Sequence, residues 1–187
     1  MAFESVKRLF RRDPLRGIGT TLYADCVVAA RRPAFYEALG VPDTTEGRLD
    51  LIMLHVFLVV RALGRAPVRD GERDPLGQAV FDAMVRDLDD TYREEGYGDS
   101  KVARLVRTAA EQFYGRALAY DEALAAGDEA GLAAALARNA YADEAADAGA
   151  LATYVARAAG AANEEELREG RARFPRIEAE EVSDVAG

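Results

Sequence analysis

The chain has 187 residues, half of them hydrophobic, which predicts one globular domain that buries about 70% of the surface of its unfolded chain. Its formal net charge of −9 argues against DNA binding, because clustered lysine and arginine bind nucleic-acid phosphates. Its single cysteine excludes an internal disulfide and favours a reducing compartment. Since no apolar run reaches the ~20 residues that cross a bilayer, and the N-terminus lacks the apolar block of a secretory signal, we expect a cytoplasmic protein.

The N-terminal segment 1–16 is expected to be basic and amphipathic. Residues 1–32 carry a charge of +4, whereas the remaining residues carry −13. A basic amphipathic helix can approach an anionic surface such as a lipid leaflet or ribosomal RNA, but it can also be a flexible arm or pack on the body. The candidate membrane-surface residues are Phe3, Lys7, Arg8, Phe10, Arg11 and Arg12.

The pattern beyond this segment is helical almost throughout, and we expect residues 17–172 to form one helical domain. A proline and two glycines between residues 14 and 19 are expected to end the N-terminal helix, so that a second helix runs from about Thr20 to Arg31. Pro33 can begin a short third helix, which Gly40 closes.

The central element of the fold is expected at residues 44–63. Asp43, with Glu46 three residues later, predicts a capped helix start. The run Leu49–Val60 that follows is interrupted by only two polar residues. A helix that is apolar on almost every side belongs at the centre of a domain.

Two long helices are predicted next. Asp74 followed by a proline predicts the start of one helix, and Asp99 predicts the start of the other. The second helix is expected to continue past Gly115 and to stop near Gly127, because its apolar residues keep the 3.6-residue period.

The last third of the chain is rich in alanine. It predicts helices at Leu132–Ala140 and Ala150–Ala159, and a short final helix capped by Asn163. Residues 173–187 form an acidic tail that is expected to be extended or disordered. Since no segment alternates with period two, the sequence predicts an all-α fold of about seven to nine helices around the buried central helix.

No catalytic, metal or cofactor site is visible in the sequence, and we expect a protein that is not an enzyme. One histidine and one cysteine cannot supply the four ligands of a structural zinc site, nor the two Glu-x-x-His motifs of a di-iron bundle. No glycine-rich phosphate loop is present, and a hydrolase triad would need His55 as its base without a serine elbow. The acidic run at residues 87–95 is better explained as a solvated helix face.

Polar residues in the central helix leave two interpretations open. Arg48 and His55 are seven residues apart and share one helix face. In the first interpretation, His55 is a neutral core histidine bonded to a neighbour, and Arg48 pairs with Asp43 or Asp50. In the second, this face lines a groove that receives a segment of a partner. A glycine between Tyr114 and Arg116 poses the same choice between close helix packing and partner contact.

Short segments along the chain occur in an order typical of one family. They are Leu22-Tyr23, Arg32-Pro33-Ala34-Phe35-Tyr36, Gly40-Val41-Pro42-Asp43-Thr44 through Gly47-Arg48, Leu54-His55-Val56-Phe57-Leu58, Phe81-Asp82, Asp87-Leu88-Asp89, Arg93-Glu94, Gly98-Asp99 and Phe113-Tyr114-Gly115-Arg116. Together they resemble the ubiquinol–cytochrome c chaperone family, assembly factors for the cytochrome bc complex, over about residues 20–126. Where that family usually has Gly-Val-Gly-Asp, this chain has Gly96-Tyr97-Gly98-Asp99, which keeps both glycines.

The resemblance implies a non-enzymatic chaperone without a cofactor that binds newly made cytochrome b until its haems are in place. Mitochondrial relatives act with a small partner protein near the ribosomal exit, and a bacterial member would act at the inner face of the cytoplasmic membrane. The candidate partner-binding residues are Arg48, Asp50, His55, Arg93, Asp99, Tyr114 and Arg116.

An all-α ligand-binding or regulatory protein is the alternative. A DNA-binding regulator would need a basic, turn-separated helix pair near the N-terminus. Residues 20–40 lack such a pair, so this alternative has no DNA-binding surface.

Overall fold

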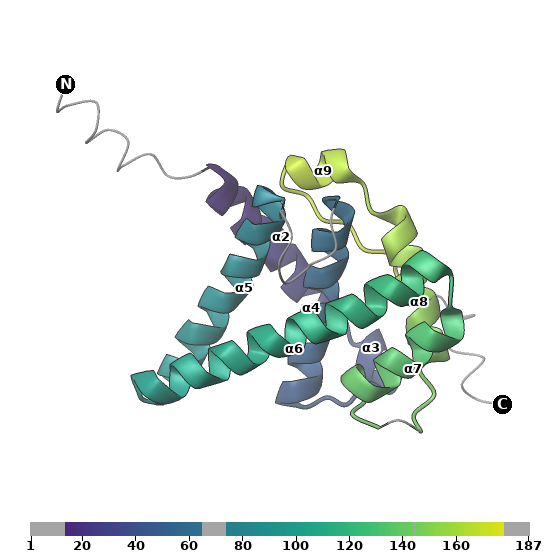
Figure 1. Ribbon diagram of the computed structural model, residues 1–187, viewed down its shortest axis with the longest axis horizontal. Coiled ribbons are helices and arrows are strands. Elements are labelled where there is room, and N and C mark those ends of the chain that lie inside the picture. The colour runs from purple at the N-terminus through teal and green to yellow at the C-terminus, as the bar shows by residue number, and fades with distance from the viewer. Residues whose placement is uncertain (1–13, 65–73, 144, 178–187) are drawn as a thin grey trace.

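The computed structural model describes residues 14–64, 74–143 and 145–177, and these segments are all-α, as the sequence predicts (Figure 1). Within them lie eight helices and no strand. The helices are α2 (Pro14–Ala30), α3 (Ala34–Glu37), α4 (Thr45–Ala62), α5 (Pro75–Glu94), α6 (Asp99–Ala126), α7 (Glu129–Ala140), α8 (Gly149–Ala161) and α9 (Glu164–Arg168). The membrane-surface candidates at residues 3–12 lie outside the described residues, as does the part of the predicted tail beyond residue 177.

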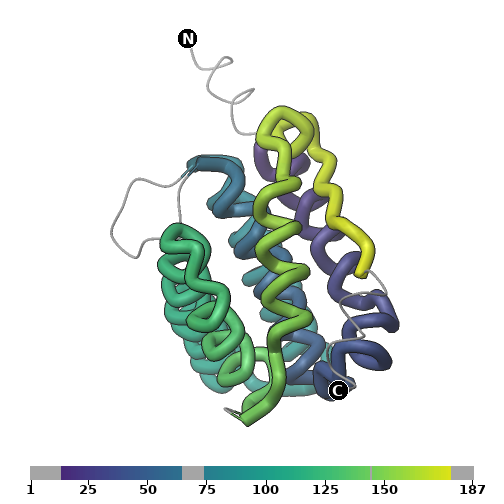
Figure 2. Tube along the Cα trace, turned by 90° about the vertical axis from the view of Figure 1, so that its right-hand side faces the viewer, coloured from purple at the N-terminus to yellow at the C-terminus, as the bar shows by residue number. Residues whose placement is uncertain are grey.

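Helix α4 is the core of the molecule. Every residue from Met53 to Val60 is buried, and α4 contacts α2, α5, α6, α7 and α8. Helix α2 packs along α5, while α6 crosses α4 and continues into the α7–α8 pair (Figures 1 and 2). A helix surrounded on all sides must be apolar on all sides, which explains the long apolar run in its sequence.

The start of α4 differs from the prediction by one residue. Thr44 is the N-cap, and its hydroxyl accepts a hydrogen bond from the Gly47 amide at 3.1 Å. Asp43 instead binds the Arg48 side chain at 2.6 Å. The predicted cap at Asp43 is therefore wrong, because a threonine one residue later reaches the orphan amide and leaves the carboxylate for the arginine.

Helix α2 begins earlier than predicted. It starts at Pro14 and runs through Gly17 and Gly19, so the expected start at Thr20 is wrong, and the boundary proposed after residue 16 falls inside a helix. A proline fits the first turn of a helix, where its missing amide costs nothing. At Gly19 an added Cβ would lie 2.7 Å from the backbone carbon of Ala79 on α5. This glycine therefore permits close helix packing and does not end a helix.

Helix α6 also starts differently but ends as predicted. Gly98 is the N-cap and makes no side-chain cap bond, whereas Asp99 lies in the first turn. The predicted cap at Asp99 is wrong, although a carboxylate in the first turn still interacts favourably with the helix dipole. The helix passes Gly115 without interruption and closes at Gly127, which has a left-handed φ of 64°.

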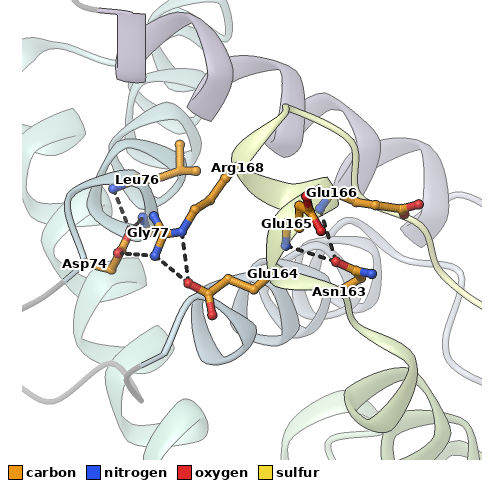
Figure 3. Close-up of polar contacts among 8 residues, drawn as sticks. All are labelled: Asp74, Leu76, Gly77, Asn163, Glu164, Glu165, Glu166 and Arg168. Atoms are coloured by element: carbon orange, nitrogen blue, oxygen red, sulfur yellow. Dashed lines mark hydrogen bonds and ion pairs between the residues drawn. The ribbon is translucent and has the colours of Figure 1, made fainter.

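The cap of α5 also links two distant parts of the chain (Figure 3). Asp74 accepts hydrogen bonds from the amides of Leu76 and Gly77 at 2.9 and 3.2 Å. Its other oxygen binds Arg168 of α9 at 2.9 Å. Asn163 caps α9, as predicted. The pair between Asp74 and Arg168 therefore holds α9 against the start of α5.

Candidate functional site

His55 lies at the centre of a buried cluster. Its ring has no exposed surface. Nδ1 lies 2.7 Å from the carbonyl of Leu51, and Nε2 lies 2.9 Å from the hydroxyl of Tyr154 on α8. Because a carbonyl can only accept, Nδ1 carries the proton and Nε2 accepts from the tyrosine. Burial lowers the pKa of His55 to about 4, so the ring is neutral.

Aromatic rings enclose this histidine on two sides. Phe35 and Phe174 meet His55 edge-on, with ring centroids 5.4 and 4.8 Å away. His55 therefore packs within the core, whereas Arg48, two turns earlier on the same helix, is exposed. The neutral core histidine is the interpretation that the structure supports, and His55 itself cannot contact a partner in this conformation.

Asp50 and Arg116 form a cross-helix ion pair between α4 and α6. Arg116 donates to Asp50 and also lies 3.4 Å from the Met53 sulfur. The two charged side chains are only 13% and 17% exposed. Burial raises the pKa of Asp50 above its ordinary value, although the charge and hydrogen bond of Arg116 act in the opposite direction. This pair fixes how α6 crosses the central helix.

A second pair, not predicted from the sequence, joins the same two helices. Arg61 binds Asp121 at 2.9 Å, and both side chains are about a quarter exposed, at 28% and 26%. Asp50 and Arg61 are eleven residues apart, which is three turns, so they lie on one face of α4. That spacing of charged residues in an otherwise apolar helix is the signal that could have identified the second pair.

The other charged candidates lie at the surface. Arg48 pairs with Asp43, and both are exposed; the hydrogen bond from Arg48 lowers the pKa of Asp43. Arg93 binds Asp89 at 2.6 Å within α5 and also binds Asp99 at the start of α6. This arginine holds the turn between the two long helices closed.

Tyr114 lies on a different face of α6 from Arg116, because two residues are about 200° apart around a helix. It packs half-buried against Phe81 of α5, with ring centroids 5.2 Å apart. One turn later, Leu118 is 50% exposed. The same face continues to Asp121 and to the exposed Ala125. We call the four residues on this face, Tyr114, Leu118, Asp121 and Ala125, the α6 stripe.

The α6 stripe leads to an open hollow between α6, α7 and α8. Arg61, which pairs with the stripe residue Asp121, also lines this hollow, whose volume is ≈ 290 Å³. The rest of its lining is mostly small or apolar, including Leu124, Leu132 and Gly160. Of the predicted partner-binding residues, only Tyr114 belongs to this surface. The predicted partner-binding residues therefore do not lie on one surface, although they belong to the motifs of one family.

No metal site is found among the described residues. No three or more histidine, cysteine, aspartate or glutamate side chains there are placed to hold a metal ion. Within the acidic run at 87–95, Asp87 accepts from Tyr23 at 2.6 Å and Asp89 binds Arg93.

None of the described helices is long and apolar enough to cross a membrane.

Comparison with known proteins identifies the family. The sequence model described as ubiquinol–cytochrome C chaperone matches residues 37–174. The chain is also similar to a solved structure, the crystal structure of the Cbp3 homolog from Brucella abortus, at 34% identity and a TM-score of 0.73, over 92% of this chain and 97% of that one. No curated protein gives a significant match. The match extends beyond the segment recognised from motifs and reaches Phe174, and the chain therefore belongs to the ubiquinol–cytochrome c chaperone family.

Proposed function

We propose that this protein is a non-enzymatic assembly chaperone that binds newly made cytochrome b, or an early intermediate, on the way to the ubiquinol–cytochrome c reductase complex. Its family membership gives it a chaperone role connected with that complex. The observation that carries the proposal is the match of nearly the whole helical body to a Cbp3 homolog. We place its action at the inner face of the cytoplasmic membrane, where such a client would be inserted.

We propose that the client lies along the α6 stripe. An apolar segment that has not yet found its partner helices needs cover, and a groove between helices is a common way to bind one. Leu118 is one of the few large apolar side chains exposed in the described part of the chain. Small residues around the adjoining hollow allow close approach of a second helix.

Deletion of the gene tests the function. The expected result is loss of assembled cytochrome bc complex and of quinol–cytochrome c reductase activity, while the other respiratory complexes stay at normal levels. Normal amounts of cytochrome b and normal reductase activity in the deletion strain would refute the proposed function.

A pair of variants tests the surface. Leu118→Asp places a charge on the α6 stripe, whereas Val28→Asp places the same charge on α2, where the valine is 70% exposed. Both variants should keep the helical circular dichroism signal, because neither residue is in the core. We expect Leu118→Asp to lose cross-linking to newly made cytochrome b and Val28→Asp to retain it. Equal cross-linking by the two variants would exclude the stripe as the client surface.

A further inference from the structure

The described C-terminal residues 171–177 form an extended segment that returns along the helical body. The segment leaves α9 at Gly170, which has a φ of 84°, and runs beside α2 (Figure 2). The tail from residue 173 is expected to be extended or disordered; residues 173–177 are extended, and the rest of the tail lies outside the described residues. We call residues 171–177 the strap.

Arginine side chains hold the strap by its main chain. Arg32, two residues after the end of α2, donates to the carbonyl of Phe174 at 3.3 Å and to the carbonyl of Pro175 at 2.5 Å. Arg157 of α8 donates to the carbonyl of Arg176. These bonds recognise an extended backbone and not a particular side chain. Proline at 175 fits such a site, because it has no amide that would need a partner.

A carboxylate and a ring complete the site. Asp25 of α2 accepts from the amide of Ala172 at 2.9 Å. Phe174 is the main apolar anchor, since its ring meets the buried His55 ring at 4.8 Å. Phe174 also lines a small cavity of ≈ 20 Å³, together with Leu58 and Leu167 of the helical body. We call the site that holds the strap, formed by Asp25, Arg32, His55 and Arg157, the strap groove.

We propose that the strap is displaceable and that the strap groove is a peptide-binding site, in which an extended partner segment with an aromatic residue followed by proline replaces it. The strap is fixed by side-chain bonds and by three partly buried apolar residues, Ala172, Phe174 and Ile177, whereas the helices around it are fixed by their own ladders of backbone bonds. Segments with few buried apolar contacts open locally at a smaller free-energy cost than a core helix. The groove is separate from the α6 stripe, so this proposal goes beyond client binding and does not depend on it.

Peptide binding to the full chain tests the proposal. The probe is a fluorescein-labelled peptide with the sequence of residues 170–177, measured by fluorescence anisotropy. Phe174→Ala weakens the strap but leaves the groove intact, so this variant should bind the peptide at least tenfold more tightly than the wild type. Arg173→Ala is the matched control and should bind like the wild type, because it removes only a 3.5 Å ion pair with Glu166 in which the arginine is 74% exposed. Adding Arg32→Ala to Phe174→Ala should abolish binding.

Equal binding by Phe174→Ala and the wild type, with helical content unchanged, would overturn the proposal. Hydrogen exchange of the wild-type chain decides the matter if Phe174→Ala fails to fold. The amide of Ala172 should then exchange at least a hundredfold faster than the amides of Met53–Val60, because it opens with the strap alone. Exchange of Ala172 at the rate of the α4 core would show that the strap is a fixed part of the fold.

Discussion

Acid should destabilise this protein through His55. The folded state holds the ring neutral with a pKa of about 4, whereas an exposed histidine has a pKa of about 6.5. Its contribution to stability is therefore complete above pH ~6.5 and is lost as the pH falls through that range toward about 4, because only the unfolded chain takes up the proton. At about 1.4 kcal/mol per pKa unit, the loss by pH ~4 amounts to about 3 kcal/mol.

A matched variant isolates this contribution from the carboxylates, which also titrate in acid. His55→Gln keeps a polar side chain but cannot be protonated in this range. Urea unfolding followed by circular dichroism at pH ~7 and at pH ~4 gives the free energy of unfolding for both chains. The wild type should lose about 3 kcal/mol more than the variant between the two pH values. Equal losses of stability in the two chains would refute the reasoning, because they would mean that the pKa of His55 is the same in the folded and the unfolded chain.

Three further predictions concern the fold, and each is tested by urea unfolding of the substituted chain. Arg116→Ala should lower the free energy of unfolding by about 2–3 kcal/mol, because it leaves the largely buried Asp50 carboxylate without its partner. Arg48→Ala, in an exposed pair, should cause no resolvable change. Similar losses from the two variants would contradict the role of the Asp50–Arg116 pair in stabilising the fold. Gly19→Ala should destabilise by about 1–3 kcal/mol through its contact with α5, whereas Gly17→Ala, with no atom near the added Cβ, should be neutral or stabilising. Thr44→Ala should lower the free energy of unfolding by about 1 kcal/mol, because it removes the N-cap of α4. An unchanged free energy of unfolding would mean that Thr44 does not cap the helix.

Local signals explain why much of the fold could be predicted. The apolar run of the central helix, the proline after Asp74 and the glycine at 127 each act within a few residues of where they stand. Errors arose where two local signals competed. Thr44 prevailed over its acidic neighbour as a cap, and Gly19 served close packing although glycine often ends helices.

The candidate site was less predictable for a physical reason. Family-typical residues include those that hold the fold together as well as those that meet a partner. His55, Asp50 and Arg116 are partnered within or between helices, while the exposed Leu118 carries no motif. The client surface that we propose rests on accessible apolar area, and accessibility is a property of packing and not of spacing.

The sequence by itself determined that this protein is all-α, that one apolar helix lies at its centre, and which family it resembles. Only the tertiary structure decided that His55 bonds to Tyr154, that Arg61 pairs with Asp121, and that the strap places Phe174 against the histidine. These partners lie 60 or more residues apart in the sequence. Helix periodicity and capping are set by neighbours along the chain, but contacts across such separations follow from how the helices pack and leave no local pattern.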